Sequence, residues 1–304
     1  MDPNRVAIGF IGNPNSRHLM VSKVPISADT STVDYMVGEL LKIAHAVSRS
    51  QPSPFIHHHL SFQPRAMLSQ TDWESPGSVG LLYSTGNRHS IPLYDRICEL
   101  LYKLNGSAMP LRETVQNFQL FICCMIWFLF LGDRRPSQLK EKLLENMRRV
   151  AARMMQEAPG ILATGLPRWK TWVLAESLRR AVLMTCLVQG IYHGWVRGYC
   201  YHELFIQALP FDNRPGLWNA DSEEEWEALL ADGGNPVTSK SAFPDLISFH
   251  EFASSFAKAP FNPGPDVFQR LLLIAHHGKG PVERALGSTG GGKAVAATSP
   301  PPSG

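Results

Sequence analysis

Apolar residues recur at three- and four-residue spacing through most of the 304-residue chain. Most of these stretches begin or end at a proline, a glycine or a capping residue, which is where helices usually start and stop. The resulting predicted helices cover residues 32–48, 90–106, 110–132, 136–159, 167–195, 222–230, 244–257 and 266–276. Because no run of alternating strands appears, we predict an all-α fold, a multi-helix bundle.

The regions outside these helices divide the chain into three parts. Residues 1–30 and 50–90 are rich in Pro, Ser, Asn and Gly without a sustained period, so irregular structure is expected there. Residues after Gly278 are poor in bulky apolar side chains and are predicted to be disordered. The predicted organisation is an irregular segment at 1–30, a helical domain at 31–277 and a disordered tail at 278–304.

Composition and charge indicate which cellular compartment and which kinds of partner are compatible with the sequence. The longest apolar run, residues 120–131, has twelve residues, whereas a membrane span needs about 20, so we predict a buried core helix and no membrane association. The N-terminus has no signal-peptide core, and the five cysteines show no C-x-x-C spacing, which favours a reducing compartment. A net charge of +3 is too small to attract a polyanion by itself.

The candidate ligand-binding motifs are weak. Residues 287–294 match the phosphate-loop pattern, but Ala294 replaces the magnesium-binding Ser or Thr and no strand or helix flanks the loop. Adjacent histidines at 57–59 and 276–277 rarely converge on one metal ion, so we expect a solvated loop for the first and a helix end for the second. Cys123 and Cys124 lie in an apolar helix, where thiols act as small hydrophobes.

No motif of nucleophilic catalysis stands out either. Neither G-x-S-x-G nor H-E-x-x-H occurs, and the pattern Ser137-x-x-Lys140 sits at an ordinary helix start. The acidic residues at 223–227 form one predicted solvated turn. The sequence therefore predicts no catalytic residue, no cofactor and no metal.

Residues 134–180 carry eleven Lys or Arg against four Glu, interleaved with Trp169 and Trp172. Basic groups beside aromatic rings can bind nucleic acid. However, these tryptophans share helical faces with Leu and Met, which indicates a core, and the arginines are then expected to form a solvated rim. In residues 136–159 the predicted buried stripe includes Leu139, and Lys140 is predicted to face solvent. Direct DNA binding is not expected.

Three segments, taken in order, resemble the regulatory domain of fungal Zn(II)2Cys6 transcription factors, particularly those that control secondary-metabolite clusters. The first runs from Glu113-Thr114 through Gln119 to Gly132-Asp133. The second and third contain the family-motif residues, expected to be structural: Trp169, Trp172, Glu176, Ser177, Arg179 and Arg180, then Leu209, Pro210, Leu217, Trp218, Ala220, Ser222, Glu225 and Trp226. The resemblance spans about residues 30 to 277, and Asn219 departs from it where an acidic residue is expected.

The resemblance implies a nuclear protein that regulates transcription through protein partners, with a small-molecule effector as a further candidate partner. Family members bind DNA through six cysteines that hold two zinc ions, and residues 1–97 contain no cysteine. Without thiolates such a zinc module cannot fold, so we predict a regulatory domain without its own DNA-binding module. Two alternatives remain: a helical small-molecule binder or enzyme with a pocket between the tryptophan helices, and a decayed gene product.

Overall fold

The computed structural model describes residues 23–60, 90–106, 109–162, 168–214, 216–231, 246–264 and 266–290. The all-α prediction is confirmed. The helices are α2 (Thr30–Ser48), α4 (Ser90–Asn105), α5 (Leu111–Phe130), α6 (Gln138–Leu162), α7 (Arg168–Arg197), α8 (Leu204–Gln207), α9 (Glu223–Ala231), α10 (Phe249–Lys258), α11 (Val267–His277) and α12 (Lys279–Gly290), with short 3-10 turns at His58–Leu60 and Leu217–Asn219.

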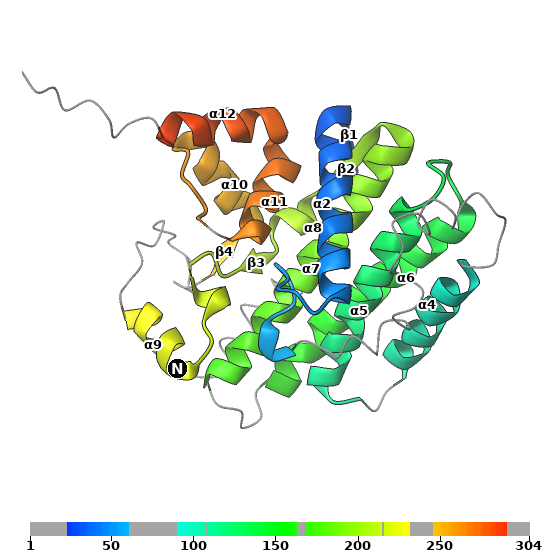
Figure 1. The fold of residues 1–304 in the computed structure, drawn as a ribbon, viewed down its shortest axis with the longest axis horizontal. Coiled ribbons are helices and arrows are strands. Elements are labelled where there is room, and N and C mark those ends of the chain that lie inside the picture. The colour runs from blue at the N-terminus through cyan, green and yellow to red at the C-terminus, as the bar shows by residue number, and fades with distance from the viewer. Residues whose placement is uncertain are drawn as a thin grey trace, which may run out of the picture.

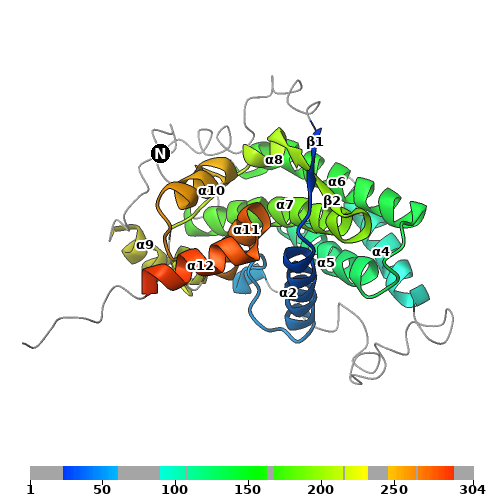
Figure 2. The same cartoon turned by 90° about the horizontal axis from the view of Figure 1, so that it is seen from above.

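Helix α7 is the axis of the bundle. It packs against α2, α5 and α6, while α11 and α12 contact α2 from the other side and α10 packs on α11. Figure 1 shows α4, α5 and α6 on one side of the molecule and α10, α11 and α12 on the other, and Figure 2 shows α7 running between the two groups. Helices α2 and α7 therefore lie between the two groups and connect them.

Helix α5 contains the long apolar run and lies in the core. It is long and apolar enough to cross a membrane by length and composition, but 72% of its most apolar window is buried inside the fold. Its Gln119 is fully buried and donates a hydrogen bond of 2.8 Å to the Phe55 carbonyl. A helix that is apolar on all sides needs neighbours on all sides, which α2, α4, α6 and α7 provide.

Four short strands pair within the described residues. Strand β1 (Lys23–Ser27) is antiparallel to β2 (Tyr199–Glu203), with Ile26 opposite Cys200, and β3 (Pro210–Phe211) is antiparallel to β4 (Ile247–Ser248). Strand β1 lies in the part of the chain predicted to be irregular. Its partner is more than 170 residues away, so local sequence could not reveal the pairing.

The first turn of α6 is oriented differently from the prediction. Leu139 is 41% exposed and Lys140 is buried, whereas Leu143, Met147 and Met154 are buried as expected. The Lys140 ammonium group donates to the carbonyls of Leu129 and Asp133, at 3.0 and 3.1 Å. The last carbonyls of a helix lack partners inside that helix, so Lys140 is buried because it caps the end of α5.

The chain remains helical beyond Gly278, where the sequence predicted disorder. Gly278 adopts a positive φ of 87°, a conformation that favours glycine, and the chain then enters α12. The backbone N–H of Lys279 donates to the Thr32 hydroxyl at 3.0 Å, and Val282 is fully buried. These tertiary contacts with α2 and α11 offset a sequence of low helix propensity up to residue 290. Residues 291–304 lie outside the described residues, as does part of the phosphate-loop pattern.

Candidate ligand-binding site

A buried ion network holds the middle of α7. The Glu176 carboxylate is fully buried and accepts hydrogen bonds from Arg179 Nε at 2.8 Å and Arg180 Nε at 3.0 Å. The backbone N–H of Asp212 also points at this carboxylate, at 3.2 and 3.3 Å. Burial raises the pKa of Glu176, and the two arginines oppose that rise.

Arg180 extends this network to the first turn of α11. Its guanidinium donates to the two Asp266 carboxylate oxygens at 2.8 and 3.3 Å and to the Pro54 carbonyl at 2.9 Å. The same guanidinium lies 4.0 Å from the centre of the Trp218 ring. Burial opposes its charge, but Asp266 and Glu176 raise the pKa of Arg180, so the guanidinium stays ionised.

The prediction of a solvated arginine rim is therefore wrong for Arg179 and Arg180, which are 4% and 1% exposed. A buried arginine is tolerated when acidic groups pair with it and satisfy its hydrogen bonds. Glu176 is visible in the local sequence, but Asp266 comes from a distant helix. Sequence spacing alone could not identify this second partner.

The second of the three segments that carry the resemblance lies in contact with both of the others: α7 packs against α5, which holds most of the first segment, and its Trp172 contacts the third. Trp172 Nε1 donates to Asp212 Oδ2 at 3.0 Å, and the Trp172 and Trp226 rings lie 5.8 Å apart. Trp169 is buried in the core, Leu209 accepts a hydrogen bond from the Phe249 backbone, and Pro210 pairs with Ser248. Ser222 caps α9, because its hydroxyl accepts from the Glu225 backbone N–H at 3.2 Å.

The histidine cluster at 57–59 is only partly solvated. His58 and His59 are exposed, but His57 is 1% exposed. Its Nδ1 accepts from the His59 backbone N–H at 3.3 Å, and its ring meets Trp218 edge-on at 5.1 Å. Burial, followed by the neighbouring His58 and His59, lowers the pKa of His57 to about 3. The solvated-loop prediction is wrong for His57, which is a neutral core residue.

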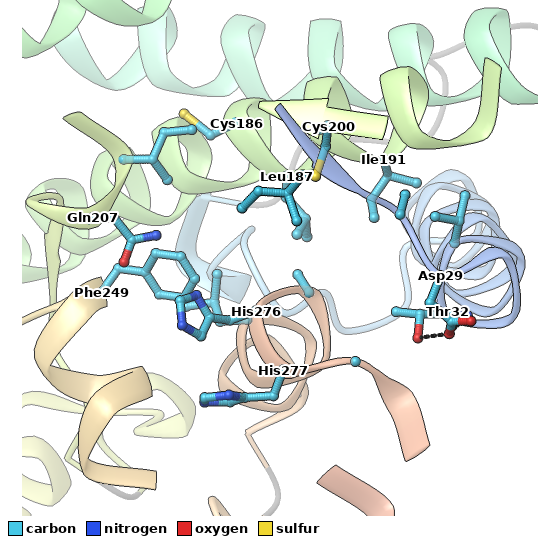
Figure 3. A pocket seen from close by; sticks show the side chains of 18 of the residues that line it. Asp29, Thr32, Cys186, Leu187, Ile191, Cys200, Gln207, Phe249, His276 and His277 are labelled. Atoms are coloured by element: carbon cyan, nitrogen blue, oxygen red, sulfur yellow. Dashed lines mark hydrogen bonds between the residues drawn. The ribbon is translucent and has the colours of Figure 1, made fainter. Parts of the chain in front are cut away.

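A cavity of about 340 Å³ lies beside the second half of α7. Its floor consists of the buried side chains of Leu183, Leu187 and Leu272, and exposed residues, including Asp29 and His276, stand at its rim. Figure 3 shows these α7 side chains facing α11 across the cavity, with Asp29 at one end. A volume of this size is in the range of small-molecule binding pockets.

The cavity lies elsewhere than the pocket of the alternative hypothesis, which was placed between the tryptophan helices. Trp169 and Trp172 lie in the first turns of α7 and do not line this cavity. Large tryptophan rings fill the space around them, whereas Gly190 leaves a gap in the α7 surface. In the sequence, a glycine within an apolar helical face was the one indication of where the cavity lies. Nothing in the sequence pointed to Gln207 as a lining residue.

The polar groups around the cavity do not form an evident catalytic set. Burial raises the pKa of the Cys200 thiol, which disfavours the nucleophilic thiolate. Cys123 and Cys124 are fully buried, and burial raises their thiol pKa values, to about 12 for Cys124. Within the ranges that the structure describes, no group of three or more His, Cys, Asp or Glu is placed to hold a metal ion.

Comparison with known proteins gives one distant similarity. The chain is 24% identical over 218 residues to "Transcription factor gsfR2" of Penicillium aethiopicum. The alignment covers 66% of this chain and 52% of that protein, so the chain spans about half the length of this curated relative. No family model matches the chain. No solved structure matches it.

Proposed function

We propose that this chain regulates transcription as a regulatory domain of the fungal zinc-cluster type, without its own DNA-binding module within these 304 residues. The observation that carries the proposal is the similarity to a protein named a transcription factor. The contact between Trp172 and Trp226 supports it, because residues from two separate segments of the resemblance pack against each other. The domain then acts by binding other macromolecules.

The proposal includes location and partners. The protein works in the nucleus through other transcription factors or the transcriptional machinery, and its target genes belong to a secondary-metabolite cluster. The 304 residues contain five cysteines, none of which forms a disulfide in the part of the chain that the structure describes, and no six-cysteine pattern. DNA contact therefore comes from elsewhere, and an enzymatic role is not part of the proposal.

A tethering experiment tests this function. The full chain is fused to a heterologous DNA-binding domain and expressed in a fungal host that carries a matching reporter gene. We expect a severalfold change of reporter expression and a nuclear fusion protein. Arg180→Ala, which breaks the buried network, should lose the effect, and Arg149→Ala, at an exposed pair, should keep it. A reporter unaffected by a folded fusion contradicts the proposal.

The cavity favours a second role within the same domain. A half-buried apolar space between α7, α2 and α11 is where a small-molecule effector can bind, since ligand sites are concave and mostly apolar. Its wall includes Thr32 and Gly278, at the junction where Lys279 joins α12 to α2. Occupancy would stabilise this junction, because a ligand stabilises the conformation that it binds. The domain is then an effector-responsive regulator.

A further inference from the structure

The cavity wall offers extensive apolar surface and little charge. Apolar side chains form most of it, including leucines and isoleucines of α7, α8 and α11, and the Phe249 and His276 rings lie 5.5 Å apart at one end. Figure 3 shows these two rings side by side on the wall. Among the described residues that line the cavity there is no Lys or Arg. Such a site suits a molecule that is apolar over most of its surface.

The rim and the floor disfavour an ionised ligand. Asp29 stands at the rim, and hydrogen bonds from Thr32 lower its pKa, so it carries a negative charge at neutral pH. An anion entering the cavity would pass this carboxylate, and an ion of either sign would lose water against a floor of leucines that offers no charged partner. Burying an unpaired charge is costly. The ligand is therefore neutral.

One polar atom in the cavity wall, the side-chain oxygen of Gln207, lacks a hydrogen-bond donor. Gln207, the last residue of α8, is 8% exposed, and its Oε1 is buried without a hydrogen-bond partner. Figure 3 shows its amide beside Phe249, at the same end of the cavity as the two rings. A buried acceptor without a partner costs free energy, and a ligand hydroxyl or N–H that reaches it recovers that cost.

Gly190 leaves open space where α7 lines the cavity. A Cβ placed at Gly190 would meet no atom within 4 Å, although the residue lies within α7, where glycine is unfavourable. A larger side chain at this position would therefore project into free volume. Gly38 of α2 has the same open surroundings but does not line the cavity. The pair provides a matched test and control.

From these observations we infer that the cavity binds a neutral, largely apolar, aromatic molecule carrying a hydroxyl group that donates to the Gln207 amide oxygen. Phe249 and His276 contact the ring system, and the leucines of α7 and α11 cover its faces. Gly190 provides the space that the ligand occupies. This inference rests on the proposed effector site and specifies the chemical class of the effector.

Binding of three related probes to the full chain tests the inference. The probes are 1-hydroxypyrene, 1-methoxypyrene and pyrene-1-carboxylate, followed by their own fluorescence. We expect saturable binding of hydroxypyrene, and affinities lower by about tenfold for the methyl ether, which cannot donate, and for the anion. Equal affinities for the three probes, or no saturable binding of hydroxypyrene, would overturn the inference.

Variants assign the site. Gly190→Leu should abolish binding, Gly38→Leu should bind like the wild type, and Gln207→Leu should bind hydroxypyrene only as tightly as methoxypyrene. Circular dichroism checks folding, and Gly190→Ala, which adds one methyl group, replaces Gly190→Leu if the leucine variant does not fold. Wild-type affinity in a folded Gly190 variant counts against the inference.

Thiol labelling gives a second readout. Cys186 and Cys200 line the cavity and are half-buried, while Cys98 is exposed on α4. Hydroxypyrene should slow iodoacetamide labelling of Cys186 and Cys200 and leave Cys98 unchanged; equal rates at Cys186 and Cys200 with and without the probe contradict the inference. The tethered reporter needs no added probe, so a failure of binding and a failure of transcriptional function are separately observable.

Discussion

Arg180 and Asp266 are separated by 86 residues in the chain and form an ion pair in which Nη2 and Oδ2 lie 2.8 Å apart. Arg180 lies in α7, and Asp266 caps the first turn of α11 by accepting from the Phe268 backbone N–H at 3.0 Å. One carboxylate therefore both starts a helix and attaches it to the bundle axis.

Removal of Arg180 should destabilise the fold. Arg180→Ala leaves Asp266 buried without its partner charge, and breaking a buried pair in this way typically costs about 3–5 kcal/mol. Chemical denaturation of the full chain measures the change in free energy of unfolding. The matched control is Arg149→Ala, at the exposed Glu145–Arg149 pair, which should cost less than about 1 kcal/mol. Equal losses of unfolding free energy in both variants would show that the buried network stabilises the fold no more than an exposed ion pair does.

Burial of His57 should make stability depend on pH in mildly acidic solution. The pKa of His57 is about 3 in the folded protein, against 6.5 for an unperturbed histidine, so as the pH falls the unfolded chain takes up the proton before the folded protein does. Stability is then fully present above pH 6.5 and falls between pH 6.5 and 3, by at most about 1.4 kcal/mol per pH unit. Denaturation of His57→Gln across this range should show a shallower slope, and a slope equal to that of the wild type would refute the assignment.

Loss of the Thr32 hydroxyl should loosen α12. Thr32 donates to Asp29 Oδ2 at 2.6 Å and accepts from the Lys279 N–H at 3.0 Å. Thr32→Val keeps the shape but removes both bonds, at a cost of about 1–2 kcal/mol. Hydrogen exchange of residues 279–290 should accelerate, while α5 stays protected. The control Thr30→Val, at an exposed position in the same helix turn, should leave exchange in α12 unchanged.

Burial should also decide cysteine reactivity in the native protein. Cys98 is exposed, whereas Cys123 and Cys124 are fully buried and have raised thiol pKa values. Because the thiolate is the reactive form, mass spectrometry after brief iodoacetamide treatment should find Cys98 modified and both buried thiols intact until the protein unfolds. Early modification of Cys123 would mean that α5 is more accessible than the structure indicates.

Helix positions could be predicted because they depend on local chemistry. The apolar period, Pro110 before α5 and the Ser222 cap of α9 all act within a few residues. Boundaries were less well predicted: α6 continues to Leu162 although Pro159 and Gly160 were expected to end it. The helix predicted from residue 244 begins at Phe249 instead, after the β4 pairing, and residues 244 and 245 lie outside the described part of the chain.

The amino-acid sequence alone determined that the chain forms amphipathic helices and a buried apolar helix, because each pattern repeats within one or two helical turns. Only the tertiary structure decided that Arg180 and His57 are buried, that Lys140 caps α5, and that a cavity opens beside Gly190. Each of these outcomes depends on a partner outside the residue's own helix or on space left by neighbouring helices, and neither is encoded in the periodicity of a single helix.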